Sequence, residues 1–167
     1  MTSRNSKRFA ASGRTLALVL AGMLVLGSGL TARAQSKDTG SGNGLEGTWH
    51  VQVTVRDCQT GAPLRPTFPA LFAFAKGGTV TDTTAGQPPA LFTPGFGVWQ
   101  HTTGHSYSAV SENFVFSPAG VWIQTHRLTR SIELDGDEFT DTIKLEISDT
   151  SGTVIVTGCG TSVGSRF

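Results

Sequence analysis

The chain has 167 residues, of which 38% are hydrophobic and 15% charged, with two cysteines and a formal net charge of +1. Five of its thirteen Lys and Arg residues precede residue 35 and all twelve acids follow it, so the remainder carries eight bases against twelve acids, a net charge of −4. A mildly acidic chain with scattered bases lacks the basic patch that nucleic acids and anionic lipids require. We therefore expect neither as a partner.

The first 34 residues have the order of a cleavable export signal. Basic residues without acids occupy 1–14, an apolar run extends over 16–30, and Ala32-Arg33-Ala34 is a small-residue cleavage site. The apolar run falls short of the roughly 20 residues that a spanning helix needs. We expect cleavage after Ala34, a secreted or periplasmic product, and no stable membrane insertion after processing.

A polar, glycine-rich segment, QSKDTGSGNG at 35–44, contains nothing to bury and predicts a flexible leader. Residues 45–167 are sufficient for one domain with its own core, and no internal repeat divides them. Apolar residues at helical spacing are absent from this part, whereas alternating runs separated by turn sequences recur throughout it. The predicted strands are 47–58, 67–75, 78–84, 95–102, 105–117, 120–134, 138–149 and 152–165.

Eight strands in hairpin succession are typical of a β-sandwich or an up-and-down barrel. In the first strand, Trp49, Val51 and Val53 share one face, and polar residues occupy the other. Asp135-Gly136 is a favoured two-residue hairpin turn, and it would place Arg130 opposite Asp141. One face of each strand is therefore predicted to be buried and the other exposed to solvent.

Cys58 and Cys159 lie near opposite ends of the predicted domain. An oxidising destination favours a disulfide between them, with two free thiols or a metal pair as the alternatives. A disulfide would make the first and last strands antiparallel neighbours, so that the sheet closes into a barrel without edges. Closure would set Arg166 opposite Val51 and diagonal to Trp49, where the two side chains could stack.

These residues carry a family resemblance. Gly47-Thr48-Trp49 opening the first strand, with an arginine ending the last, resembles the calycin pattern of lipocalins and related barrels. In that superfamily the Trp and the Arg close one end of the barrel. The resemblance covers the two terminal strands, and the chain is shorter than most lipocalins and lacks their C-terminal helix. An allene oxide cyclase or dirigent-like barrel is the second possibility.

The face of the last strand that is predicted to be buried contains glycines, which leave space for a ligand. Alternatively, they serve strand coiling or admit a bulky neighbour such as Trp49. From the first interpretation we predict a binding site for a small hydrophobic molecule, without a cofactor. Its predicted walls are Trp49, Phe114, Trp122, Ile143, Leu145, Gly158 and Gly160.

Four ionisable residues share the face that is predicted to point inward. A loop of 117–121 would set Glu112 opposite His126, and Arg130 would pair with Asp141. A carboxylate and an imidazole in an apolar cavity could perform acid–base catalysis, as in a cyclase or isomerase. The favoured interpretation is a buried polar network that fixes strand register.

Two further segments have candidate roles. His101 and His105 flank a turn, but no third metal ligand is identifiable, so no metal site is expected. The loop of 86–97, which contains Leu91, Phe92 and Phe96, is predicted to cover one barrel mouth. The sequence thus favours an exported small-molecule binder; a barrel cyclase and a non-catalytic secreted interaction module are the alternatives.

Overall fold

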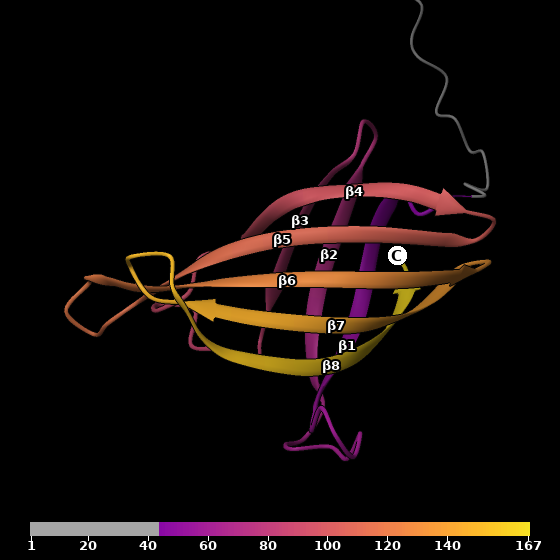
Figure 1. Cartoon of the computed structure of the whole chain (residues 1–167). Coiled ribbons are helices and arrows are strands. Elements are labelled where there is room, and N and C mark those ends of the chain that lie inside the picture. The colour runs from indigo at the N-terminus through magenta and orange to yellow at the C-terminus, as the bar shows by residue number, and fades with distance from the viewer. Residues whose placement is uncertain (1–43) are drawn as a thin grey trace, which may run out of the picture. The chain divides into compact units, whose positions relative to one another are not determined.

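A computed structural model describes residues 44–167 (Figure 1), and the predicted signal peptide and the leader up to residue 43 lie outside this range. Within it, no helix is long and apolar enough to cross a membrane. The strands are β1 Gly47–Arg56, β2 Phe68–Ala75, β3 Thr79–Thr84, β4 Gly95–Thr103, β5 Ser106–Phe116, β6 Trp122–Asp135, β7 Glu138–Ser148 and β8 Val154–Arg166. Each begins and ends within two residues of its prediction.

Every strand pairs antiparallel with the next along the chain, and β1 pairs with β8, so the sheet is a closed up-and-down barrel. The all-β class and the eight-strand barrel predicted from sequence are both confirmed. The alternation of apolar and polar residues explains the architecture, because in β1 and β2 every second residue is buried. Closure leaves no edge strand around the barrel.

The predicted disulfide, from which closure of the barrel was inferred, is present. Cys58 bonds Cys159 across a sequence separation of 101 residues. The register of β1 against β8 differs from the prediction by two residues, since Arg166 faces Trp49 rather than Val51. A shift of two keeps each side chain on its face. The predicted stacking is therefore confirmed, with the guanidinium carbon of Arg166 4.3 Å from the Trp49 ring centroid.

One end of the barrel is filled by aromatic side chains. Trp49 is fully buried and packs edge-on against Phe139, with ring centroids 5.1 Å apart. Its indole Nε1 donates to the carbonyl of Leu45 at 3.0 Å. Arg166 closes this end by donating to the carbonyls of Glu46 at 2.6 Å and Gly44 at 2.9 Å. This arrangement is consistent with the calycin-like resemblance.

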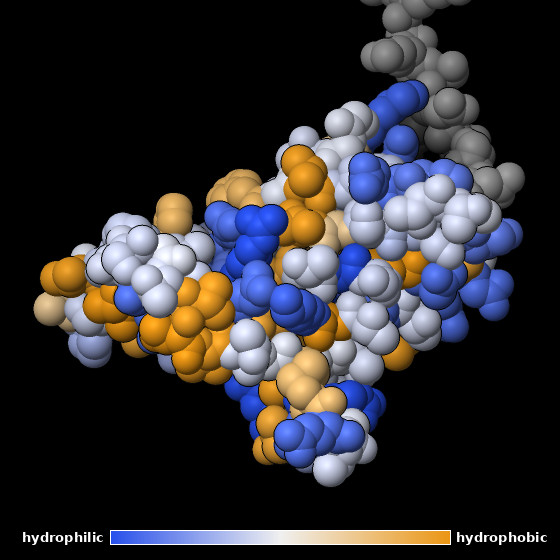
Figure 2. Space-filling model, viewed as in Figure 1, coloured by the Kyte–Doolittle hydropathy of each residue, from blue (hydrophilic) through white to orange (hydrophobic). Residues whose placement is uncertain are grey.

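The opposite end is formed by the longest strands. Figure 1 shows the β5–β6 and β7–β8 turns projecting together on one side of the barrel. Apolar side chains are exposed there, and Figure 2 shows hydrophobic residues gathered toward this projection. Phe114 and Trp122 belong to this outer surface, where they are 48% and 41% exposed and contact each other with ring centroids 5.8 Å apart.

Two hairpin registers differ from the prediction. In β6–β7, Asp135 pairs with Glu138, which moves the turn to Gly136-Asp137 and sets Arg130 opposite Ile143. That shift of two residues preserves both faces. In β5–β6, an irregularity between Val115 and Phe116 accompanies a register in which Asn113, not Glu112, faces His126. A shift of one residue exchanges the two faces, so it changes which β5 residues enter the barrel.

Candidate functional site

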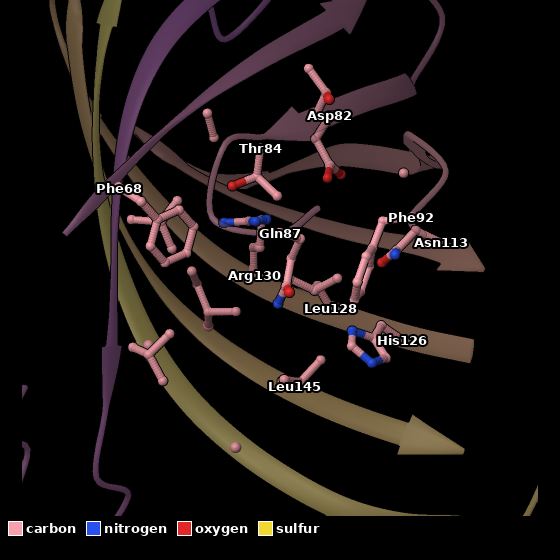
Figure 3. Close-up of a pocket in the computed structure, with 18 of the residues that line it drawn as sticks. Phe68, Asp82, Thr84, Gln87, Phe92, Asn113, His126, Leu128, Arg130 and Leu145 are labelled. Atoms are coloured by element: carbon pink, nitrogen blue, oxygen red, sulfur yellow. The ribbon is translucent and has the colours of Figure 1, made fainter. Parts of the chain in front are cut away.

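The lumen contains a cavity of about 620 Å³ (Figure 3). Its walls come from β1, β2, β3, the segment before β4, and β5 to β8, so it lies inside the barrel rather than on its surface. Its apolar lining includes Val53, Val55, Phe68, Ala70, Phe72, Phe92, Leu128, Ile143, Leu145 and Ile147. Its polar lining includes Arg65, Asp82, Thr84, Gln87, Asn113, His126 and Arg130.

Glycines of β8 help to keep this space open. Gly158 faces Leu145 and Gly160 faces Ile143 across the β7–β8 ladder. A Cβ added at Gly158 would meet the Leu145 side chain only at 3.6 Å, which is ordinary contact. All four of these residues line the cavity, where the sequence placed them as ligand walls. Their role in ligand binding stays a prediction.

The remaining predicted wall residues lie elsewhere. Trp49 belongs to the packed end and does not line the cavity. Phe114 and Trp122 point outward, so their predicted inward direction is wrong. At Gly164 the alternative interpretation holds, because a Cβ there would clash with the Phe139 ring. The glycines of β8 therefore serve two purposes: they leave space at one end and admit an aromatic ring at the other.

Residues of the loop that the sequence predicted to cover one barrel mouth line the cavity. Phe92 forms an isolated bridge with Val115 of β5 and lines the cavity. Next to it, the Phe114 amide donates to the Thr93 hydroxyl at 3.0 Å, and the Phe116 amide donates to the Leu91 carbonyl at 2.8 Å. These bonds hold the loop against the end of β5. Phe96 lies beyond it in β4 and is 63% exposed.

A buried ion pair lies where the cavity meets the packed core. Arg130 donates from Nη1 to Oδ2 of Asp141 at 2.7 Å, and both residues are 4% exposed. Ser162 donates to the second carboxylate oxygen of Asp141 at 2.7 Å. The predicted contact between Arg130 and Asp141 thus exists, although it runs diagonally across the β6–β7 ladder. A buried polar network therefore exists at this place, and its role in fixing strand register stays the favoured interpretation.

Glu112 lies outside the barrel, which corrects the prediction that it faces inward. Its carboxylate pairs with Arg127 at 2.6 Å, and the two side chains are 46% and 50% exposed. Both faces of β5 carry apolar and polar residues, so alternation alone did not determine its inward face. The predicted pairing of Glu112 with His126 is consequently wrong, and this acid–base pair is not assembled.

His126 stands at the mouth of the cavity. Its ring is edge-on to Phe92, with centroids 5.5 Å apart, and it lines the cavity opposite Asn113. Desolvation by burial lowers the pKa of His126 below its usual value of 6.5. The imidazole is therefore held neutral more strongly than in water, which suits an apolar cavity.

Sequence reasoning missed two charged residues of the wall. Arg65 places its guanidinium 4.1 Å from the Phe68 ring centroid and donates to the Gly86 carbonyl at 3.2 Å. Asp82 points inward beside Phe72, its partner in the β2–β3 ladder. The available signal was parity, because Asp82 shares a strand face with buried Val80, and an acid on an inward face marks a polar site.

The histidine turn forms a local hydrogen bond. His101 Nε2 lies 2.9 Å from the Gly104 carbonyl oxygen, within the β4–β5 turn. Among residues 44–167, no three His, Cys, Asp or Glu side chains are grouped closely enough to hold a metal ion. Neither His101 nor His105 is among the residues that line the cavity.

The cavity combines a concave apolar wall with a few inward polar groups, which is the usual character of a small-molecule site. Comparisons with models of protein families, with curated proteins and with solved structures found no match for the chain. The cavity's geometry is therefore the basis on which a function is assigned.

Proposed function

We propose that this protein is an exported, non-catalytic binder of a small hydrophobic molecule, which it holds in the barrel lumen. The observation that carries the proposal is the cavity of about 620 Å³. Pockets for small-molecule ligands span roughly 300–1,000 Å³. At about 30 Å³ per non-hydrogen atom, the volume of a water molecule in the liquid, the cavity has room for roughly twenty such atoms.

The wall chemistry supports a hydrophobic ligand. Leucine, isoleucine, valine and phenylalanine side chains supply most of the large apolar groups of the lining, and transfer of apolar surface from water into such a site is favourable. Drug-sized ligands gain about 0.3 kcal/mol per non-hydrogen atom, so twenty atoms correspond to about 6 kcal/mol. That free energy corresponds to a dissociation constant of tens of micromolar, on the order of 40 μM.

Export is part of the same proposal. Disulfides persist in oxidising compartments, and Cys58–Cys159 ties together the first and last strands of the barrel. Together with the signal-like order of residues 1–34, the disulfide supports a secreted or periplasmic location. The Trp49–Arg166 closure supports a calycin-like barrel as the scaffold, with the lumen as the binding site.

Native mass spectrometry of protein purified from its own export compartment tests the proposal. We expect a mass that lacks residues 1–34 and carries a co-purifying small molecule. Gly158→Leu should abolish that adduct, because the new side chain would extend into the cavity from a position with ordinary contact to Leu145. Thr157→Leu is the matched control, since the neighbouring Thr157 is exposed on the outer face of β8.

The outcomes separate clearly. An adduct present in the wild type and in Thr157→Leu, but absent from a folded Gly158→Leu protein, supports lumen binding. A wild-type protein that is empty and takes up no apolar probe would contradict the proposal. Retention of the adduct by Gly158→Leu would place the ligand outside the lumen and would also contradict it.

A further inference from the structure

Asp82 is an unpaired carboxylate in the cavity wall. It lines the cavity, and its Oδ2 atom is buried without a hydrogen-bond partner among the described residues 44–167. Its position depends on Gly95, its partner in β4, because a Cβ there would lie 2.6 Å from Oδ2. A buried acceptor without a partner is costly, and the cost is higher when the acceptor carries charge.

Arg130 reaches the ring of Phe72, the residue that pairs with Asp82. Its guanidinium carbon is 4.4 Å from the centroid of Phe72, which faces Asp82 directly in the β2–β3 ladder. Among the described residues, only Asp141 accepts a hydrogen bond from this guanidinium, and the bond comes from Nη1. A guanidinium has five N–H donors, so donors remain for another acceptor.

The two groups face the cavity at its inner end. Phe72 is 2% exposed and belongs both to the packed core and to the cavity lining, so it marks the boundary between them. Figure 3 shows Asp82 and Arg130 reaching into the cavity from different strands, and it shows Phe92 and His126, whose rings contact each other, on another part of the wall. A ligand that fills the cavity would bring its inner end between an acceptor and a donor.

We propose that the ligand carries a neutral hydroxyl group at this inner end, donating to Asp82 and accepting from Arg130. The inference rests on the proposed function and specifies its ligand class. A hydroxyl satisfies both groups at once, because it has one donor and two acceptor lone pairs. The apolar remainder of the ligand then extends along Leu128 and Leu145 toward Phe92.

Other head groups satisfy only one side of the site. A carboxylate would accept from Arg130 but would place like charges together at Asp82. An ammonium would pair with Asp82 but would face the guanidinium of Arg130. An ether oxygen accepts from Arg130 and offers no donor to Asp82. A site with buried polar groups discriminates strongly against a ligand that leaves one of them unpaired.

Calorimetric titration with two isomeric ligands measures how much the O–H donor of the ligand contributes to binding. 1-Octanol and 1-methoxyheptane have the same atoms and nearly the same size, but only the alcohol can donate. We expect the mature wild-type protein to bind 1-octanol about tenfold more tightly than the ether, as for a hydrogen bond to a charged group. Octanoate and octylamine should both bind more weakly than 1-octanol.

Variants of Asp82 test whether this residue causes the preference for 1-octanol over 1-methoxyheptane. Asp82→Ala should reduce the preference for the alcohol to about twofold or less, because the acceptor is removed. Asp82→Asn keeps the size of the side chain and one acceptor oxygen, and should show an intermediate preference even if the alanine variant folds poorly. Asp135→Ala is the matched control, since Asp135 is an exposed acid at the end of β6, outside the cavity lining, and its variant should keep the tenfold preference.

Failure of the inference is distinguishable from failure of the proposed function. If the wild type binds the two isomers equally, the proposal of a ligand hydroxyl group is contradicted, whereas the proposal of binding in the lumen is not. A preference that survives in both Asp82 variants, or tighter binding of octanoate or octylamine than of 1-octanol, would also contradict the proposal of a ligand hydroxyl group. Binding of none of the four probes would overturn the proposed function itself.

Discussion

The two ends of this barrel are built from the same alternating strands but are held in different ways. The closed end contains Trp49, Phe74 and Phe139, all at most 2% exposed, and Arg166 seals it. The other end contains the cavity, and the Cys58–Cys159 disulfide lies on this side, with Cys159 in the cavity wall. Where side chains do not fill the lumen, a covalent bond joins the strands.

The difference follows from side-chain volume along single strands. In β8, Gly164 lies against the Phe139 ring, whereas Gly158 faces a leucine and leaves space. Close packing supplies dispersion contacts that a cavity lacks, so the filled end contributes more stability per residue. The open end lacks that contribution and contains the cavity in which we propose that a ligand binds. The strand order is the same at both ends.

The largest expected effect is in the filled end. Trp49→Ala should destabilise the protein by about 3–5 kcal/mol, because it removes a fully buried aromatic side chain and leaves a void. Guanidinium denaturation followed by circular dichroism measures the loss. Trp122→Ala is the matched control. Trp122 is 41% exposed on the outer surface, so this variant should lose much less unfolding free energy. Equal losses would contradict the assignment of the packed end.

Removal of the disulfide should have the next largest effect. Replacing both Cys58 and Cys159 by serine is expected to cost about 2–5 kcal/mol, because the bond closes a long loop and restricts the unfolded chain. The same denaturation measurement applies, under oxidising conditions. Reduction of the wild type should reproduce the loss, and the double variant should be insensitive to reductant. No change in either case would show that the open end does not depend on the bond.

The smallest expected effect is a pH dependence from His126. Burial lowers its pKa in the folded state, so below about pH 6.5 the unfolded chain binds a proton that the folded protein does not. Stability from this residue is therefore present above that pH and is lost as the pH falls toward the folded-state pKa. His126→Gln should show a shallower decline in unfolding free energy from about pH 7.5 to about pH 5.5.

The control for this measurement is His105→Gln, which changes an exposed histidine between β4 and β5. It should keep the wild-type slope. An unchanged slope in His126→Gln would mean that burial of this ring does not influence folding. A steeper slope would mean that its protonated form is favoured in the folded state, opposite to the expectation.

Much of the fold was predictable, because its signals are local. The strand boundaries follow from alternation and turn residues, as in β1 and β7. The disulfide and the Trp49–Arg166 stacking depend only on β1 lying beside β8. These predictions tolerate a register error of two residues, which moves a side chain along the barrel without turning it to the other face.

The candidate site was less predictable, because it depends on register and on volume. Glu112 was placed inside by a one-residue error in β5–β6, where an irregularity at Val115/Phe116 changes the pairing. Asp82 was missed because β3 is short and mostly threonine, so that its parity with Val80 is a weak signal, and the pairing with Phe72 makes its inward face evident. The loop that contains Phe92 was predicted to lie at the barrel, since its prolines exclude a strand, and Phe92 lines the cavity.

By itself, the sequence predicted the all-β class, the eight strands and the disulfide pair, because each depends on residue type and spacing along the chain. The closure of one end by Trp49 and Arg166 was what the resemblance to calycins implied. Only the tertiary structure decided which end is hollow, which face of β5 enters the lumen, and that Arg130 reaches the ring of Phe72, the residue that pairs with Asp82. Those features are set by contacts between strands, where one residue of register exchanges inside for outside.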